Sequence, residues 1–327
     1  MRYVKFLSLA GGVALFALLL ADTDIGAIAV QLAGLGWGIL YVCAVYAVAF
    51  LVDTVTWHLT LDPLPLTGRL QYRLWKIRMV GEAFNDILPL GSFGGEPVKA
   101  VLAMRMLGLD AHAVTASLVL TRTINTLALA LFLAFGFALV LQADALPPSI
   151  KWLSGMGLGL LLIGVAGLFA VQRYQVTTAV FTRLFGRSLA SWLQRAQGHI
   201  REVDGRLAHF YRRRQPHFFS ALGLALMNWA LGAVEAYLTL TLLGHSVTYV
   251  DAWIIESAAQ LMRAGAFFVP AAIGVQEGAY VVITGLLLGR PEAGLAAALV
   301  RRLRQILWIA GGLAIFMAMR SRKQESK

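Results

Sequence analysis

Long runs of apolar residues, separated by short polar segments, dominate the pattern along the chain. A helix that crosses a bilayer needs about 20 consecutive, mainly apolar residues, and several of the runs approach or exceed that length. The runs cover residues 4–20, 35–57, 113–141, 152–171, 218–243, 251–269, 275–289 and 293–319. The pattern therefore predicts an all-α, polytopic integral membrane protein with about 7 to 10 helical elements.

The composition agrees with this pattern. Of the 327 residues, 59% are hydrophobic and only 14% are charged, whereas a soluble domain has about 25% charged residues. The mean hydropathy is +0.72. Such a chain has too few polar residues to cover a separate soluble domain, so we expect one transmembrane domain over residues 1–327.

Basic residues predict which side of the membrane each end of the chain faces. Arg2 and Lys5 place the N-terminus in the cytoplasm, because cytoplasmic segments carry an excess of lysine and arginine. Arg320 and Arg322 place the C-terminus on the same side. The segment Met1–Leu20 has the shape of a secretory signal, but we interpret it as an uncleaved first helix, since further membrane helices follow.

Residues 172–216 are strongly basic, with nine arginines and only Glu202 and Asp204 as acids. Their apolar residues recur at steps of three and four, which predicts a cytoplasmic amphipathic helix against anionic phospholipids of the inner leaflet. A basic loop that only follows the charge rule is an equal alternative. Either interpretation accounts for the net charge of +11 without nucleic acid as a partner.

The sequence contains no recognised catalytic motif. The single cysteine, Cys43, lies in an apolar run and can form neither an intramolecular disulfide nor a thiolate metal cluster. There is no HExxH motif, no Ser/His/Asp or Cys/His arrangement, and no phosphate-binding GxxxxGK[ST] loop. We therefore expect no enzymatic activity, no metal and no cofactor.

Two stretches of the chain share one pattern of prolines, glycines and a glutamate. The stretch "LPLGSFGGEPVK" covers residues 88–99, and "VPAAIGVQEG" covers residues 269–278. Three pairs of identical residues are each 181 positions apart: Pro89 and Pro270, Glu96 and Glu277, Gly108 and Gly289. The shared spacing favours an internal duplication, with repeat cores at residues 77–141 and 251–319.

The two copies are predicted to have opposite orientations in the membrane. The helix that leads into the first copy starts at cytoplasmic arginines, whereas the helix that leads into the second starts outside, at Asp251. Such inverted repeats occur in transporters, where discontinuous helices meet near the middle of the bilayer. Proline and glycine break a helix where protein or water can satisfy the freed backbone groups. We therefore predict two broken or re-entrant helices, with breaks at Pro89, Gly94, Gly95, Pro97, Pro270, Gly274 and Gly278.

Charged and polar residues gather around both breaks. Glu96 and Glu277 follow the breaks directly, and an ionised carboxylate at the centre of a bilayer costs about 2.5–3.5 kcal/mol unless it has a partner or faces a cavity. We expect a polar cavity at the repeat interface in which the following residues bind substrate: Asn85, Glu96, Lys99, Arg122, Glu256, Gln260, Arg263, Glu277 and Arg302. Structural ion pairs between helices are the alternative for each residue taken singly.

The two stretches around the breaks also resemble a known family. "RMVGEAFNDILPLGSFGGEPVKAVLAMRMLG" (78–108) and "IIESAAQLMRAGAFFVPAAIGVQEGAYVVITGLLLG" (254–289) are similar to the bacterial lysylphosphatidylglycerol synthase/flippase transmembrane family. The likeness is greatest to its short members that are associated with hopanoid biosynthesis. It extends over nearly the whole chain and is weak in residues 1–60 and 142–216.

The resemblance implies that the protein moves a polar-headgroup lipid, of phospholipid, aminoacyl-lipid or hopanoid type, between the leaflets of the bacterial inner membrane. It places Asn85, Glu96 and Lys99 in one functional loop, and Gln276 with Glu277 in the other. Lys99 stands at a position where the resemblance leads us to expect arginine. A lysine offers a phosphate a single point charge, whereas an arginine would donate two hydrogen bonds. The synthase domain of the larger members is not expected here. The alternative is a non-transporting accessory protein that scaffolds an enzyme of hopanoid or glycolipid synthesis.

Overall fold

The computed structural model describes most of the predicted membrane helices. It covers residues 33–61, 64–87, 94–174, 213–266 and 272–324, together with residues 26, 205, 207, 210 and 269. In this described part the chain is helical and contains no β-strand, which confirms the all-α prediction. The predicted first helix (residues 4–20), Pro89, Pro270 and most of the basic segment 172–216 lie outside it.

The described part contains nine helices, five of which are long and apolar enough to cross a membrane. The nine are α3 (Gly38–Thr60), α4 (Gly68–Ile87), α5 (Glu96–Leu107), α6 (Ala111–Gln142), α7 (Pro148–Tyr174), α10 (Gln215–Leu242), α11 (Tyr249–Gly265), α12 (Val275–Leu288) and α13 (Pro291–Gln324). The five candidate spans are α3, α6, α7, α10 and α13. By contrast, α5 and α12 are about 18 and 21 Å long at 1.5 Å per residue, less than the hydrocarbon thickness of about 30 Å.

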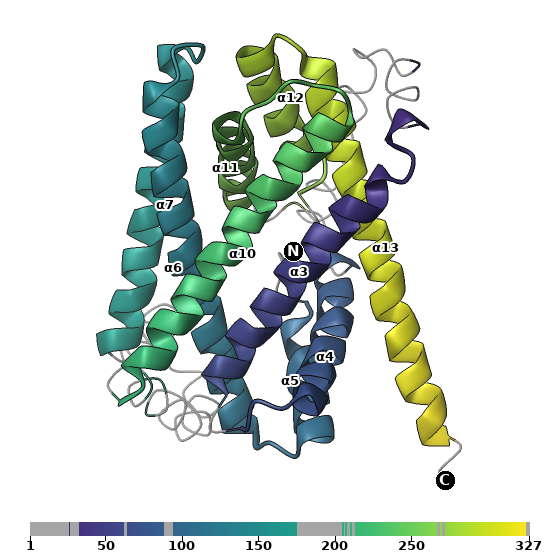
Figure 1. Cartoon of the computed structure of the whole chain (residues 1–327). Helices are drawn as coiled ribbons and strands as arrows, with labels where there is room; N and C mark the ends of the chain where they lie inside the picture. The colour runs from purple at the N-terminus through teal and green to yellow at the C-terminus, as the bar shows by residue number, and fades with distance from the viewer. Residues whose placement is uncertain are drawn as a thin grey trace, which may run out of the picture.

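Two helical hairpins enter the bundle from opposite ends (Figure 1). In the view of Figure 1, α4 and α5 pack together in the lower half, and α11 and α12 pack together in the upper half. The end of α4 and the start of α5 point toward the middle of the bundle, as do the end of α11 and the start of α12. This is the arrangement that inverted repeats with re-entrant helices predict.

Matching glycines end the short helix of each hairpin. α5 ends at Gly108 (φ 69°) and α12 ends at Gly289 (φ 67°), both in the left-handed conformation that favours glycine. The N–H of each glycine donates to a carbonyl four residues earlier, that of Met104 or Gly285. Because the sequence repeat aligns these two glycines, the duplication has a counterpart in the backbone.

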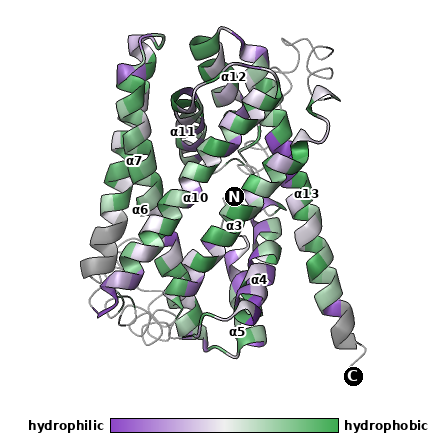
Figure 2. Ribbon diagram, viewed as in Figure 1, coloured by the Kyte–Doolittle hydropathy of each residue, from purple (hydrophilic) through white to green (hydrophobic). Residues whose placement is uncertain are grey.

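The distribution of polar residues agrees with a membrane environment. Apolar residues cover much of the long helices, whereas α4 is largely hydrophilic (Figure 2). On α7, Leu160 and Ile163 are both 71% exposed. Large apolar side chains on an outer helix suit contact with lipid, and the hydrophilic α4 needs partners within the protein.

The long helix α13 joins the two hairpins, because it packs along both α12 and α4. Glycines permit these close approaches. A Cβ at Gly294 would overlap the backbone carbonyl of Tyr280 on α12, and a Cβ at Gly312 would overlap that of Met79 on α4. Small residues at such contacts let helix backbones approach closely in a membrane.

Replacing Gly312 by alanine tests the contact between α13 and α4. We expect Gly312→Ala to lower Tm, because overpacking costs about 1–3 kcal/mol, although alanine is otherwise the better helix former by about 1 kcal/mol. Gly159→Ala on α7 is the matched control, since a Cβ there meets nothing within 4 Å, and it should keep or raise Tm. Circular dichroism during heating in detergent measures both. Equal Tm values for the two variants would contradict the contact.

His245 lies in the loop between α10 and α11, outside the membrane-spanning helices. Burial lowers the pKa of His245 below its usual 6.5, the charge of Arg290 lowers it further, and Glu292 acts in the opposite direction. Neither ring nitrogen has a hydrogen-bond partner within the described residues. The fold therefore favours the neutral form of His245.

This environment makes stability depend on pH. The pKa of His245 is lower in the folded protein than in the unfolded chain, whose value is 6.5. Folding is therefore most favourable above pH 6.5, where His245 is neutral in both states. This contribution to stability is lost as the pH falls below 6.5. We expect Tm to fall more for the wild type than for His245→Asn between about pH 7.5 and about pH 5. Thermal unfolding in detergent measures the difference. An equal fall in both proteins would show that His245 does not contribute.

Candidate functional site

The first hairpin closes through a contact between α4 and α5. The side chain of Asn85 on α4 accepts a hydrogen bond from the backbone N–H of Gly95, with 2.6 Å between Oδ1 and N. A Cβ at Gly95 would overlap the carbonyl of Gly81, so this approach requires glycine. Asn85 and Gly95 therefore fix the place where α5 begins.

Lys99 and Glu96 form an ion pair in the first turn of α5. The Nζ of Lys99 lies 2.8 Å from Oε1 of Glu96. The alkyl chain of Lys99 lies against Gly81, where any Cβ would collide with it, and Lys99 is only 8% exposed. Its charge also acts on Glu82 of α4. Lys99 thus places a positive charge among the acids of α4 and α5.

Glu277 and Arg302 form the corresponding ion pair of the second hairpin. Glu277 lies in the first turn of α12 and is 1% exposed. Its Oε1 accepts a hydrogen bond from Nε of Arg302 on α13, and Nη1 of Arg302 donates to Oε1 of Gln305 at 2.7 Å. The helix begins at Gly274, whose φ of 80° favours glycine.

Three polar atoms of this second hairpin and α13 have no hydrogen-bond partner within the described part of the chain. They are Oε2 of Glu277, Nη2 of Arg302 and Nε2 of Gln276. Buried polar atoms are nearly always hydrogen-bonded, because an unpaired one costs about 1–3 kcal/mol. One acceptor and two donors are therefore available to a ligand near Glu277.

A line of polar interactions connects the two hairpins. Asp86 on α4 lies near Gln305 and experiences the charge of Arg302. Arg263 on α11 acts electrostatically on both Glu82 and Asp86. We call the residues joined in this way the hairpin cluster: Glu82, Asn85, Asp86, Glu96, Lys99, Arg263, Glu277, Arg302 and Gln305.

Glu256 and Gln260 belong to a separate network whose carboxylate is fully partnered. Both oxygens of Glu256 accept hydrogen bonds from Arg301 on α13. Tyr280 on α12 donates to Oε2 at 2.7 Å, and Gln260 donates to Oε1 at 2.6 Å. This arrangement favours the structural alternative for Glu256 and Gln260, which is an ion pair that locks α11, α12 and α13 together.

Two more ion pairs, one buried and one partly buried, join helices that are distant in sequence. Arg78 on α4 binds Asp53 on α3, and Nε of Arg304 on α13 lies 2.8 Å from Oε1 of Glu235 on α10. The guanidinium of Arg304 also lies over the ring of Tyr46, 3.5 Å from its centroid. Sequence reasoning missed these pairs. An acid in an apolar helix signals that a partner is needed, but it does not identify the partner.

The remaining predicted residues lie at the margins of the two hairpins or away from them. Arg122 is exposed on α6, whereas the hairpin cluster draws on α4, α5, α11, α12 and α13. Gly94 precedes α5, Pro97 lies in its first turn, where proline is tolerated, and Gly278 lies within α12. Within the described residues, no group of three or more His, Cys, Asp or Glu side chains is placed to hold a metal ion.

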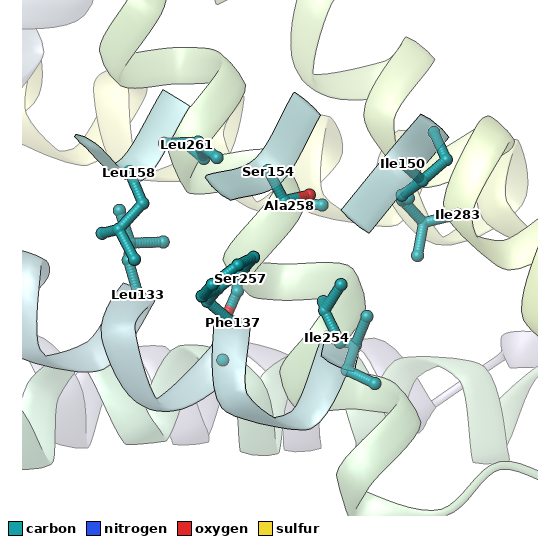
Figure 3. A pocket seen from close by; sticks show the side chains of 12 residues that line it. Leu133, Phe137, Ile150, Ser154, Leu158, Ile254, Ser257, Ala258, Leu261 and Ile283 are labelled. Carbon is teal, nitrogen blue, oxygen red and sulfur yellow. The ribbon is translucent and has the colours of Figure 1, made fainter. Parts of the chain in front are cut away.

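A small apolar pocket lies among α6, α7, α11 and α12 (Figure 3). Its lining is apolar apart from Ser154 and Ser257, and it contains no residue of the hairpin cluster. On α11, Ser257 and Leu261 face this pocket, whereas Glu256 and Gln260 point about 100° away from them around the helix. The pocket is therefore not the polar cavity that the sequence predicts.

Comparison with known proteins gives one match. The family model for the lysylphosphatidylglycerol synthase TM region matches residues 5–312. No curated protein and no solved structure matches the chain. The match confirms the resemblance drawn from the two motif stretches, while the narrower likeness to hopanoid-associated members stays a prediction.

Removing one partner of the Glu256–Arg301 pair should destabilise the fold strongly. Arg301→Met leaves Glu256 buried without its counter-charge, a change that costs about 3–5 kcal/mol and lowers Tm. Combining it with Glu256→Gln should recover part of the loss, because no unpaired charge then stays buried. Thermal unfolding in detergent compares the variants. A double variant as unstable as Arg301→Met alone would contradict the structural role of the pair.

Proposed function

The chain belongs to the lysylphosphatidylglycerol synthase transmembrane-region family, and from this premise we propose that it moves a polar-headgroup lipid between the leaflets of the bacterial cytoplasmic membrane. The headgroup binds at the hairpin cluster, while the apolar tails stay in the surrounding lipid. Aminoacyl transfer is not part of the proposal, since the matched family model is that of the transmembrane region.

One observation carries this proposal: polar groups near Glu277 are buried in a membrane protein and yet incompletely hydrogen-bonded. Arg302 and Gln276 offer donors to the oxygens of a phosphate or an ester, and Glu277 offers an acceptor to an amine or a hydroxyl group. A purely structural ion pair would gain stability from satisfying these atoms within the protein. A headgroup with both acceptors and donors satisfies them instead.

The two short helices add to the positive potential of the site. Both α5 and α12 begin at the ends that point toward the middle of the bundle (Figure 1). The N-terminus of a helix carries a partial positive charge, which favours anionic groups. Glu96 and Glu277 lie in these first turns. An anionic headgroup would take their place near the helix ends during transport.

The inverted hairpins offer a route for movement between leaflets. Glycines lie at the contacts of the first hairpin. Gly81 and Gly95 let α4 and α5 approach each other closely, and Gly312 lets α13 pack on α4. Alternating access in inverted-repeat transporters arises when one repeat rocks against the other around a central site. We infer that α4–α5 opens the cluster toward one leaflet and α11–α12 opens it toward the other.

We also propose a lipid partner for the basic segment 172–216. Its nine arginines favour anionic phospholipid headgroups at the cytoplasmic surface. With the basic segment and both termini on the cytoplasmic side, the first hairpin lies on the side of the inner leaflet.

Replacing the two glutamates of the short helices tests the transport site. We expect Glu96→Gln and Glu277→Gln each to slow lipid movement in proteoliposomes about tenfold or more, because a hydrogen bond to a charged group contributes about 1.5–3 kcal/mol. Dithionite quenching of a fluorescent lipid analogue measures the rate. Asp144→Asn is the control, since Asp144 is exposed between α6 and α7, and it should match the wild type.

Size-exclusion profiles establish that the variants are folded. Movement of lipid at the wild-type rate by both folded glutamine variants would show that the transport site is elsewhere. If the wild type itself moves no lipid, the accessory role in lipid biosynthesis becomes the better explanation of the family membership.

A further inference from the structure

The hairpin cluster contains one more acid than base. Its charged residues are the acids Glu82, Asp86, Glu96 and Glu277 and the bases Lys99, Arg263 and Arg302. The neighbouring Arg78 is already paired with Asp53. A carboxylate without a compensating base is costly in the interior of a membrane protein. The charge balance therefore favours one protonated acid in the cluster.

The surplus lies on α4. Glu96 has Lys99 and Glu277 has Arg302 as hydrogen-bonded partners. Glu82 and Asp86 remain, one helical turn apart on the same face of α4. Two carboxylates that interact at this spacing do not ionise independently, and the first charge disfavours the second.

The surroundings of the two acids differ. Glu82 is faced by several bases and by an amide donor: Lys99 on α5, Arg78 on α4, Arg263 on α11 and Asn85 on α4. Asp86 is faced by the acid Glu82, by Arg263 on α11 and by Arg302 and Gln305 on α13. The phenol of Tyr46 on α3 interacts with both acids. Because Arg302 is engaged by Glu277, Asp86 has the weaker positive surroundings of the two.

We propose that Asp86 is a proton-binding site, and that the uptake and release of this proton drive lipid movement. The second part rests on the proposed function, whereas the first part stands on the charges and contacts of the cluster. The proton is exchanged with water in whichever compartment the cluster faces.

A line of polar contacts connects this proton to the second hairpin. Asp86 lies near Gln305, Gln305 accepts from Arg302, and Arg302 donates to Glu277. When the O–H bond of Asp86 breaks, the remaining carboxylate competes with Glu277 for Arg302. The atoms that respond are Nη2 of Arg302 and Oε2 of Glu277, which have no partner among the described residues. Protonation of Asp86 thereby controls how firmly α13 holds the second hairpin.

Infrared spectroscopy tests the proton site without any assay of transport. In a detergent without ester groups, the wild type at about pH 5.5 should show the C=O band of a protonated carboxylic acid, shifted by deuterium exchange. Asp86→Asn should remove this band. Glu82→Gln should also remove it at that pH, because Asp86 then has Arg263 to itself and ionises. Asp144→Asn is the control and should keep the band.

Two outcomes would overturn the proton site. One is the absence of the band in the wild type at about pH 5.5. The other is its persistence in folded Asp86→Asn, which would assign the proton to another acid.

Proteoliposomes with a pH gradient test the coupling. A gradient of one pH unit corresponds to about a tenfold ratio for each proton carried, so we expect it to bias the lipid distribution by up to that factor. Any lipid movement that Asp86→Asn retains, at whatever rate, should not respond to the gradient. Wild-type transport that ignores the gradient would overturn the coupling and leave the proposed function standing. An Asp86-dependent infrared band without lipid movement would overturn the proposed function, and the coupling with it, while the proton site stands.

Discussion

Charged side chains inside a bilayer need partners from the protein, because lipid offers none, and α13 supplies most of them here. Successive residues of a helix point about 100° apart, so neighbouring arginines on α13 reach different helices. The pairs are Arg301 with Glu256 on α11, Arg302 with Glu277 on α12, and Arg304 with Glu235 on α10. On another face of α13, Gly312 allows α4 to pack closely against it. The position of α13 thus determines where both hairpins and α10 lie.

The buried ion pairs differ in how completely they are hydrogen-bonded, and the proposed binding site rests on this difference. Glu256 accepts hydrogen bonds on both oxygens, and Arg304 combines its partner Glu235 with the ring of Tyr46. Around Glu277, buried polar atoms stay unpaired within the described structure. A complete network rigidifies the bundle, whereas an incomplete one between the two hairpins fits the ligand binding proposed for the cluster.

The hairpin arrangement gives the backbone groups at the starts of α5 and α12 the polar surroundings that lipid lacks. α5 and α12 are too short to cross the bilayer, and the exposed backbone groups at their starts need polar surroundings. Placing the two starts toward the middle of the bundle gives them protein neighbours and brings the acids and bases of both repeats into one cluster. The same geometry that stabilises the helix starts therefore creates the candidate site.

The sequence alone determined the helical membrane fold and the places next to Glu96 and Glu277 where α5 and α12 begin, while the duplication stays a prediction. These features depend on local properties: runs of apolar residues, prolines and glycines that break helices, and glycines such as Gly108 and Gly289 that take a left-handed conformation. Only the tertiary structure decided the pairing of charges. It assigned Glu256 to a structural network, brought Asp86 to Gln305, and joined Asp53 to Arg78. The reason is that partners on different helices meet according to how those helices rotate and pack, which no local pattern records.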